Sequence, residues 1–420
     1  MNDHPALEAA ARFGVRLGLD RMRAFLATLA DPQLRSPVVH IGGTNGKGST
    51  TTLVTAALVD AGYRVGTTIS PHLQQINERI QIDGAPLADD VLDGLLCDVD
   101  AARRRWAESV GAPDAPLTYF ELATASAFVA FARAHVGVSV VEVGLGGRLD
   151  ATNVVEPSAC AIVTVGMDHE AELGSTFGAI AGEKAGILKP GVPGVLGPMP
   201  EEAQRAIEAV ATSVGAPLWV PGRHLRRAAR SDGAWDLATP AGQLSGVRLR
   251  LAGAHQGGNA LVALGLLHHM RAAGLSIPDD AILSGFARAF IGGRVEELAP
   301  GLVVDGAHNA EGAAALAAWL ARRERPRRRL LLWGMGEDRE PEAILPVLLP
   351  HVDAVITTHG RHPKARPSGE LAARIAPWVP GVRDGGPIEV ALAAARADAD
   401  EVIVSGSLYL VGAVRDLVGR

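Results

Sequence analysis

The chain has 420 residues and a formal net charge of -6 at pH 7. This length is more than one hydrophobic core usually holds, so we expect two domains. Hydrophobic residues make up 48% and charged residues 20%, which are the proportions of a soluble globular protein, and the net charge gives no support for a nucleic-acid partner.

Cysteine usage and the apolar pattern exclude further classes of protein. Cys97 and Cys160 are too few for a disulfide framework or a thiolate metal cluster. The start of the chain has no basic stretch followed by an apolar run, and no apolar run approaches membrane-spanning length. We therefore expect a cytoplasmic protein without a membrane partner. Two short basic clusters, 103–105 and 322–329, are interpreted as solvated faces.

Short apolar runs alternate with alanine-rich stretches of helical period, which predicts an α/β protein with a parallel sheet. The expected buried strands are 37–41, 64–68, 139–143, 160–165, 302–304, 329–333, 354–357 and 401–404. The expected helices are 49–61, 119–134, 201–214, 259–273, 310–323 and 387–397. The polar segment 222–247 predicts a small antiparallel sheet. Since a new series of strands and helices starts after it, we place the domain boundary between 293 and 294.

The segment HIGGTNGKGSTTT, residues 40–52, lies between an expected strand and an expected helix. It fails the ordinary phosphate-loop pattern twice, because Ile41 replaces the first glycine and Gly48 replaces the hydroxyl residue. Its glycines still allow backbone N–H groups to surround phosphate, Lys47 supplies a positive charge, and Ser49 supplies a hydroxyl for magnesium. A plain connection is the alternative, and phosphate binding is the favoured interpretation.

Polar residues also follow the neighbouring strands. Ser70 comes after the second strand, where a hydroxyl can face a ligand or simply lie in a solvated loop. Glu142 interrupts an apolar strand before GLGG, which favours a role facing a metal or orienting water. The alternative for Glu142 is an ion pair with a buried arginine such as Arg148. His169 follows another strand in VTVGMDHEAELG, and Lys184 in GEKAGI would ordinarily be a surface lysine.

The second half of the chain has one similar turn, VVDGAHNAEG. Asp305, His308 and Asn309 lie there between a strand and a helix. Asn309 is expected to cap the helix, and since capping needs only one of the three, the other two favour a ligand role. Asn259 and Arg294, taken alone, would be a helix cap and a surface residue.

Eight motifs follow one another along the chain in the order GTNGKGST, SPHL, TYFE, EVGLGGRLDATN, DHEAELG, GEKAGILKPGVP, DGAHN and SGSLYLVG. Together they resemble the motifs of the folylpolyglutamate synthase family, which includes bifunctional dihydrofolate synthases and is related to the Mur ligases. The resemblance extends from about Gly18 to the C-terminus. It implies a phosphate-loop ATPase domain with a parallel sheet and the folate or pteroate site over 1–293. A smaller Rossmann-like α/β glutamate-ligase domain would cover 294–420. The family's loop reads G-T-N-G-K-G-[ST], which accounts for the shifted hydroxyl.

The resemblance also implies roles for individual residues. The implied ATP contacts are Thr44, Asn45, Gly46, Lys47, Gly48, Ser49, Thr50, Asn259, Arg294 and Asp305. The implied metal ligands are Ser49, Ser70, Glu142 and His169. The implied catalytic residues are Lys47, Glu142, His169, Lys184 and His308. The implied folate or pteroate contacts are Thr118, Tyr119, Phe120, Glu121, Leu149, Asp150 and Ala151. Lys184 matches a lysine that the family carbamylates, which replaces the surface interpretation.

The activity implied is ATP-dependent addition of L-glutamate to a folate through an acyl phosphate, with dihydropteroate as a further acceptor. ATP and Mg²⁺ at two sites would take part, with K⁺ as an additional candidate, and the protein would be a monomer. Arg16 stands where bifunctional relatives carry an acidic residue, which puts the dihydropteroate activity in doubt. A phosphate-loop ATPase or kinase acting on a non-folate carboxylate is the alternative, but it does not need GLGGRLDATN or GEKAGILKPG. A catalytically silent module ranks last, because Lys47, Glu142, His169 and Lys184 are all present.

Overall fold

The computed structural model describes residues 4–11, 13–14, 16–111, 117–360 and 362–420, and these form two compact units. The N-terminal unit contains the described residues up to Arg250 and the segment Gln256–Phe290. The C-terminal unit contains Leu251–His255 and Ile291–Arg420. Among the described residues, every helix is too short or too polar to cross a membrane.

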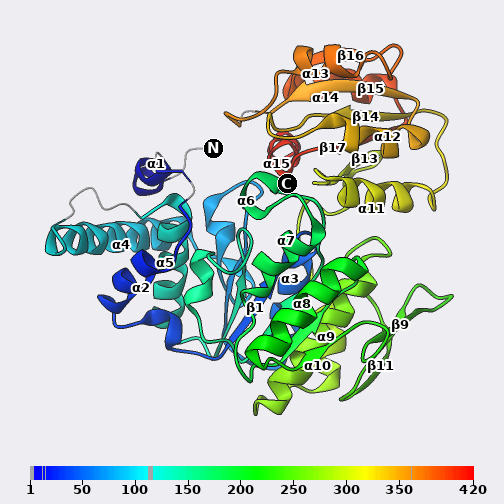
Figure 1. Ribbon diagram of the computed structural model, residues 1–420. Helices are drawn as coiled ribbons and strands as arrows, with labels where there is room; N and C mark the ends of the chain where they lie inside the picture. Colours follow the sequence, from blue (N-terminus) through cyan, green and yellow to red (C-terminus); the bar gives the residue numbers. More distant parts are fainter. Residues whose placement is uncertain (1–3, 12, 15, 112–116, 361) are drawn as a thin grey trace. The chain divides into compact units, whose positions relative to one another are not determined.

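The N-terminal unit is built on an eight-stranded sheet with the spatial order β4-β3-β2-β5-β1-β6-β7-β8. Figure 1 labels the strand β1 of this sheet. The pairs β2–β3 and β3–β4 are antiparallel, and the other neighbours are parallel. The strands are β1 Val38–Gly42, β2 Val65–Thr68, β3 Ile80–Ile82, β4 Ala85–Pro86, β5 Val138–Glu142, β6 Ala159–Ile162, β7 Gly194–Leu196 and β8 Leu218–Trp219. Parallel strands with such apolar sequences are stable only when both faces are covered.

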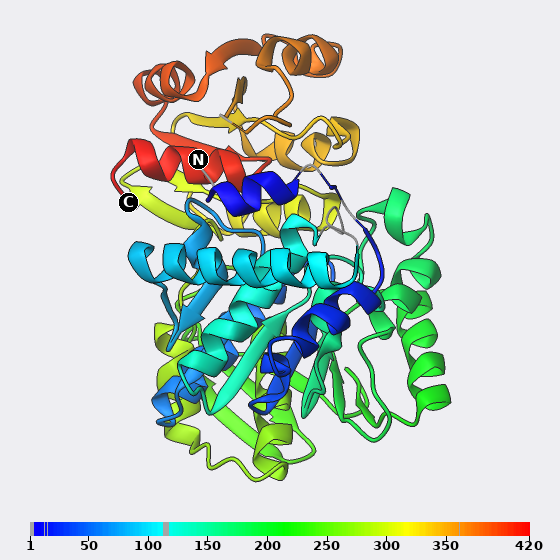
Figure 2. The ribbon, with the colours of Figure 1, turned by 90° about the vertical axis from the view of Figure 1, so that its left-hand side faces the viewer.

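Helices cover both faces of this sheet. The helices α3 and α9 lie on one face, with α10 packed against α3. On the other face α5 and α4 cover one half, and α7 and α8 cover the other (Figure 2). The helices are α1 Pro5–Ala11, α2 Asp20–Ala27, α3 Lys47–Asp60, α4 Asp89–Ser109, α5 Tyr119–Arg133, α6 Glu170–Leu173, α7 Phe177–Ala185, α8 Glu201–Val214, α9 Gln256–Ala272 and α10 Asp279–Arg288.

A small antiparallel sheet follows β8, as the polar segment 222–247 predicts. Its strands are β9 Arg226–Ala229, β10 Trp235–Thr239 and β11 Gly242–Val247, with β10 in the centre. The indole of Trp235 packs on the start of α9, where a side chain at Gly257 would come within 2.7 Å of the ring. The close approach of a ring to the helix backbone explains why glycine stands there.

The C-terminal unit has a six-stranded sheet with the order β12-β13-β17-β14-β15-β16 (Figure 1). Only the β12–β13 pair is antiparallel among these described strands. The strands are β12 Glu296–Ala299, β13 Leu302–Val304, β14 Arg329–Trp333, β15 Ala354–His359, β16 Arg383–Pro387 and β17 Glu401–Ser405. The helices are α11 Ala310–Leu320, α12 Leu345–Leu348, α13 Ser368–Ile375, α14 Ile388–Asp398 and α15 Leu408–Leu417. These parallel sheets with helices confirm the predicted fold class.

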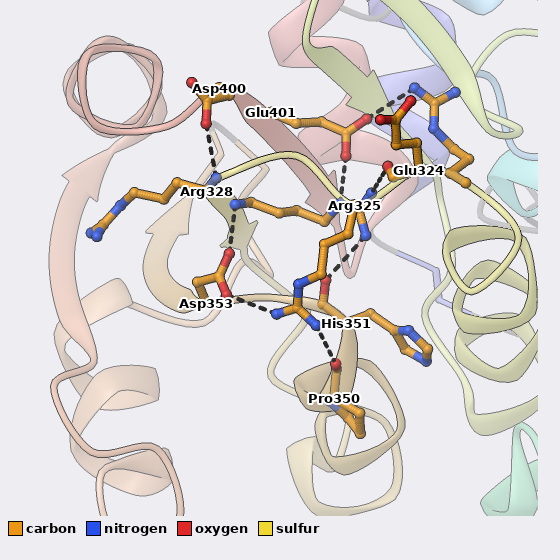
Figure 3. A network of polar contacts seen from close by, with 10 residues as sticks. Glu324, Arg325, Arg328, Pro350, His351, Asp353, Asp400 and Glu401 are labelled. Atoms are coloured by element: carbon orange, nitrogen blue, oxygen red, sulfur yellow. Dashed lines mark hydrogen bonds and ion pairs between the residues drawn. The ribbon is translucent and has the colours of Figure 1, made fainter.

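The basic cluster 322–329 is not wholly a solvated face, so that interpretation is wrong for Arg329. Arg329 begins β14, is 2% exposed and forms an ion pair with the buried carboxylate of Glu401 at the start of β17. Arg323 also bonds Glu401, and the backbone N–H of Arg329 donates to Asp353. Figure 3 shows Asp353 and Glu401 within this network of polar contacts. These charges join the starts of neighbouring parallel strands, which is a structural role.

Candidate active site

The phosphate loop joins β1 to α3 at the carboxyl end of the sheet. Gly46 caps α3 with φ 81°, a left-handed conformation that favours glycine. A Cβ at Gly46 would lie 2.5 Å from Oδ1 of Asn259, which extends from α9. Gly43 has φ 144° and lies close to the backbone of Thr164. The structure therefore brings Asn259, predicted from a distant segment, against this loop.

Thr164, which the sequence did not reveal as part of the site, lies just beyond β6 and holds the loop by hydrogen bonds. Its carbonyl accepts from the backbone N–H of Thr44 at 2.9 Å. Its hydroxyl accepts from the N–H of Asn45 and donates to the carbonyl of Asn45, both at 2.9 Å. These bonds use backbone groups of the loop, so residue type in the loop gives no signal of them. A hydroxyl residue just beyond β6 was the only hint in the sequence.

Two lysines share one carbonyl oxygen of the loop. Nζ of Lys47 donates to the carbonyls of Gly43 and Thr44 at 3.1 Å, and Nζ of Lys184 donates to that of Gly43 at 3.2 Å. Lys184 is only 4% exposed, so the surface alternative is wrong. Burial, followed by repulsion from Lys47, lowers the pKa of Lys184 to about 7. A large share of this amine is therefore neutral, and hence nucleophilic, near neutral pH.

Glu142 lies beside the phosphate loop, since it ends β5 and pairs in register with Ile41 of β1. It is buried, and the backbone N–H of Ser70 donates to its Oε2 at 3.4 Å. Arg148 is not its ion-pair partner, because Arg148 is exposed and pairs with Glu183 at 2.8 Å. The alternative of a Glu142–Arg148 pair is therefore wrong. Carboxylate and hydroxyl oxygens at this edge suit a hard cation.

His169 does not follow a strand directly, because β6 ends at Ile162 and an irregular segment intervenes. It is exposed at the start of α6, and its Nε2 lies 3.7 Å from Oδ1 of the buried Asp168. Within the described ranges, no group of three or more His, Cys, Asp or Glu side chains could hold a metal ion by itself. Magnesium does not need such a group, because protein carboxylates usually bind it together with water and substrate phosphates.

A cavity of about 250 Å³ opens beside these residues. Six of the seven predicted folate or pteroate contacts line it, and Tyr119 does not. The lining residues are Gly14, Arg16, Leu17, Gly18, Ser70, Pro71, Arg79, Thr118, Phe120, Glu121, Gly144, Leu145, Leu149, Asp150 and Ala151. Tyr119 instead lies under the guanidinium of Arg79, 5.3 Å from the ring centre. Ser70 thus belongs both to the cavity and to the contact with Glu142.

One wall of this cavity is fixed by the start of α5. The Thr118 hydroxyl accepts from the N–H of Glu121 at 3.2 Å, and the Glu121 carboxylate accepts from the N–H of Thr118 at 2.8 Å. This reciprocal cap stabilises the first turn of the helix. Arg21 of α2 forms an ion pair with Glu121 at 3.0 Å. Two of the predicted contacts therefore have structural partners of their own.

The C-terminal unit gathers its predicted residues at the carboxyl end of β13. Asp305 is buried and accepts from the N–H groups of Val295 and Ala307, each at 2.8 Å. Burial raises the pKa of Asp305, and Arg294 opposes this shift. His308 Nδ1 is 2.7 Å from the Gly306 carbonyl.

Asn309, next to His308, accepts from the N–H of Gly312 at 2.9 Å. Asn309 therefore caps α11, as predicted.

Comparison with known proteins adds a family to this geometry. A family model described as Mur ligase, glutamate ligase domain matches residues 293–408. The dihydrofolate synthase/folylpolyglutamate synthase of Mycobacterium tuberculosis is 34% identical over 441 residues, covering 96% of this chain and 90% of the relative. Escherichia coli FolC in complex with DHPP and ADP has a TM-score of 0.89 at 31% identity, over 98% of this chain and 96% of that one.

A further solved structure is of a bifunctional folylpolyglutamate synthase/dihydrofolate synthase with Mn, AMPPNP and L-glutamate bound. Its TM-score is 0.86 at 31% identity, over 99% of this chain and 97% of that one. The phosphate loop, the parallel sheets and the matched ligase domain define an ATP-dependent ligase of the Mur type. More narrowly, the chain belongs to the dihydrofolate synthase/folylpolyglutamate synthase family, as its motifs predict.

Proposed function

We propose that the protein uses ATP to add L-glutamate to a folate. The observation that carries this proposal is the position of Ser70, which lines the cavity and contacts Glu142 beside the phosphate loop. A carboxylate at the end of a substrate in the cavity would thus lie on the same side as the nucleotide phosphates. One of the solved structures named above carries DHPP and ADP, and the other carries Mn, AMPPNP and L-glutamate; an adenine nucleotide and L-glutamate are ligands that such a reaction uses.

The reaction has two steps with balanced groups. The terminal phosphoryl group of ATP is transferred to the substrate carboxylate, giving an acyl phosphate and ADP. The neutral amine of glutamate then attacks the acyl carbon, the C–N bond of the amide forms, the C–O bond to phosphate breaks, and the nitrogen gives up one proton as phosphate leaves. Lys47 and the loop N–H groups offset phosphoryl charge, and the cavity limits the access of water to the acyl phosphate.

The residues present fit a divalent cation at the phosphates. Ser49, Ser70 and Glu142 would hold one Mg²⁺, and His169 with a carbamylated Lys184 would hold a second. Such cations supply positive charge against the transferring phosphoryl group. We assign ATP contacts to the loop and Asn259 in residues 1–293, and to Arg294 and Asp305 in the glutamate-ligase part, residues 294–420. His308 is a further candidate catalytic residue in the glutamate-ligase part.

An ADP-release assay with tetrahydrofolate or dihydropteroate as acceptor tests the proposal. We expect glutamate-dependent turnover with tetrahydrofolate and weaker turnover with dihydropteroate, because the cationic Arg16 lines the cavity. Absence of glutamate-dependent ADP release with both acceptors would contradict the ligase. Glutamate-independent release would instead favour an ATPase or kinase. Replacing K⁺ by Na⁺ in the same assay tests the monovalent cation. We further propose that the enzyme is cytoplasmic and monomeric, and sedimentation of the active enzyme checks the monomeric state.

A further inference from the structure

A histidine lies in the middle of β1, in a strand whose other residues are apolar. His40 is fully buried, and this burial, with a smaller effect of Lys189, lowers its pKa to about 3. The imidazole is therefore neutral. Its Nε2 lies 2.9 Å from Oγ1 of Thr152, and no described residue hydrogen-bonds its Nδ1. A buried imidazole with one bare nitrogen costs free energy that a valine at this position would not.

The single bond of His40 continues into a chain of three side chains. The Thr152 hydroxyl donates to Oδ1 of Asp150 at 2.5 Å, and the Thr152 N–H donates to the same oxygen at 3.0 Å. A hydroxyl has one hydrogen, so Oγ1 of Thr152 must accept from His40. This fixes the imidazole as the Nε2–H tautomer, with the lone pair on Nδ1. The direction of donation therefore runs from His40 through Thr152 to Asp150.

The Asp150 carboxylate is the point at which this chain reaches the cavity. Its Oδ2 accepts from the backbone N–H of Leu145 at 2.8 Å, so it joins the two ends of the loop 145–150. Leu145, Asp150 and Ala151 all line the cavity, as does Gly144. The backbone at Gly144 lies against the Phe120 ring, where a Cβ would be 2.3 Å from Cζ. A shift of this loop would therefore change the wall of the cavity.

We propose that His40 and Thr152 are positioning residues for the acceptor cavity: they orient the Asp150 carboxylate, which holds the loop 145–150 as a wall against the folate ring. This inference rests on the proposed function. It gives His40, which lies in the strand that leads into the phosphate loop, a role in binding the acceptor. A purely structural role for the same network would lower stability without separating the two substrates.

The test compares the KM for tetrahydrofolate with the KM for ATP. Thr152→Val removes the hydroxyl and keeps the shape, and His40→Met removes the N–H donor. Thr152→Ser and His40→Gln restore a donor at each position. Thr55→Val is the matched control, because Thr55 is another buried threonine whose hydroxyl is 2.8 Å from that of Thr67, away from the cavity lining.

We expect Thr152→Val and His40→Met to raise the KM for tetrahydrofolate about tenfold, equal to about 1.4 kcal/mol, with the KM for ATP within about twofold. Thr152→Ser and His40→Gln should recover most of this loss. Thr55→Val should lower the melting temperature without separating the two KM values. If Thr152→Val or His40→Met does not fold, Thr152→Ser and His40→Gln are compared with wild type instead. These two variants should raise the KM for tetrahydrofolate by less than about tenfold and leave the KM for ATP unchanged, and an equal change in both KM values would overturn the inference.

Two outcomes would overturn the inference. If Thr152→Val changes neither KM, or changes both equally as Thr55→Val does, the network has only a structural role. If the serine variant is as impaired as the valine variant, the hydroxyl is not the cause. Failure of the proposed function is a separate result, because wild type would then neither bind tetrahydrofolate by titration calorimetry nor turn it over.

Discussion

Removing the amine of Lys184 tests the most unusual feature of the phosphate loop. Lys184→Ala deletes the nitrogen that shares the Gly43 carbonyl with Lys47. We expect this variant to lose most glutamate-dependent ADP release. A short exogenous carboxylate such as acetate or propionate should restore part of it, because the cavity left by the side chain can hold the carboxylate that carbamylation would have supplied.

The magnitude follows from the pKa of about 7. At pH 7.5 roughly three-quarters of such an amine is neutral, whereas about one in a thousand ordinary lysine amines is. Carbon dioxide adds to the neutral amine, forming an N–C bond and releasing one proton. The product is an anion where the reacting amine was neutral, so it gains an attraction to the ammonium group of Lys47. This gain favours the modified state and creates a ligand for a cation.

Three measurements check this reasoning. Mass spectrometry and ¹³C NMR with labelled bicarbonate should detect one carbamate in wild type and none in Lys184→Ala. Activity of wild type should fall when carbon dioxide is removed. Lys189→Ala is the control, since Lys189 is a half-buried lysine of the same unit, and this variant should retain its label and its activity. Wild-type rates in Lys184→Ala, or a carbamate label detected in Lys184→Ala, would refute the argument.

Three further variants probe the loop, the second unit and the buried histidine. Gly46→Ala should raise the KM for ATP by at least about tenfold, because φ 81° and the 2.5 Å approach to Asn259 both exclude a Cβ; an unchanged KM in nucleotide titrations would contradict this. Glu401→Gln leaves buried Arg329 without its charge partner and should lower the free energy of unfolding by about 3–5 kcal/mol in denaturant melts, and a loss below about 1 kcal/mol would contradict it. Burial lowers the pKa of His40 to about 3 in the folded state, so between pH 6.5 and 3 the unfolded chain binds one more proton than the folded chain. As the pH falls over this range, the free energy of unfolding of wild type should decrease by up to about 5 kcal/mol more than that of His40→Gln. Parallel profiles of unfolding free energy against pH would refute this.

Local patterns were sufficient for the parts of the site that depend on neighbouring residues. The strand, the glycines and the helix around Lys47 are adjacent in the chain, and the cap made by Asn309 depends on a residue three positions away. The burial of Lys184 could not be predicted this way, because its partner Gly43 lies far away in the sequence and reaches it only through sheet order. Thr164 also lies far from the loop in the sequence, and it bonds backbone groups that every residue possesses, so no residue type in the loop indicates this contact.

The strand register explains why one strand can serve both parts of the site. Alternate side chains of a strand point to opposite faces of the sheet, and a slip of one residue would exchange the faces. In β1, Ile41 pairs with Glu142 at the phosphate edge, and His40 pairs with Val141 one residue earlier. His40 therefore extends to the opposite face from Ile41, where Thr152 and the loop after β5 lie. A shift of β1 by one residue would bury Ile41 against Thr152 and leave Asp150 without its donor chain. The apolar pattern that fixes the register of β1 thus also fixes the position of the phosphate loop relative to the wall of the acceptor cavity.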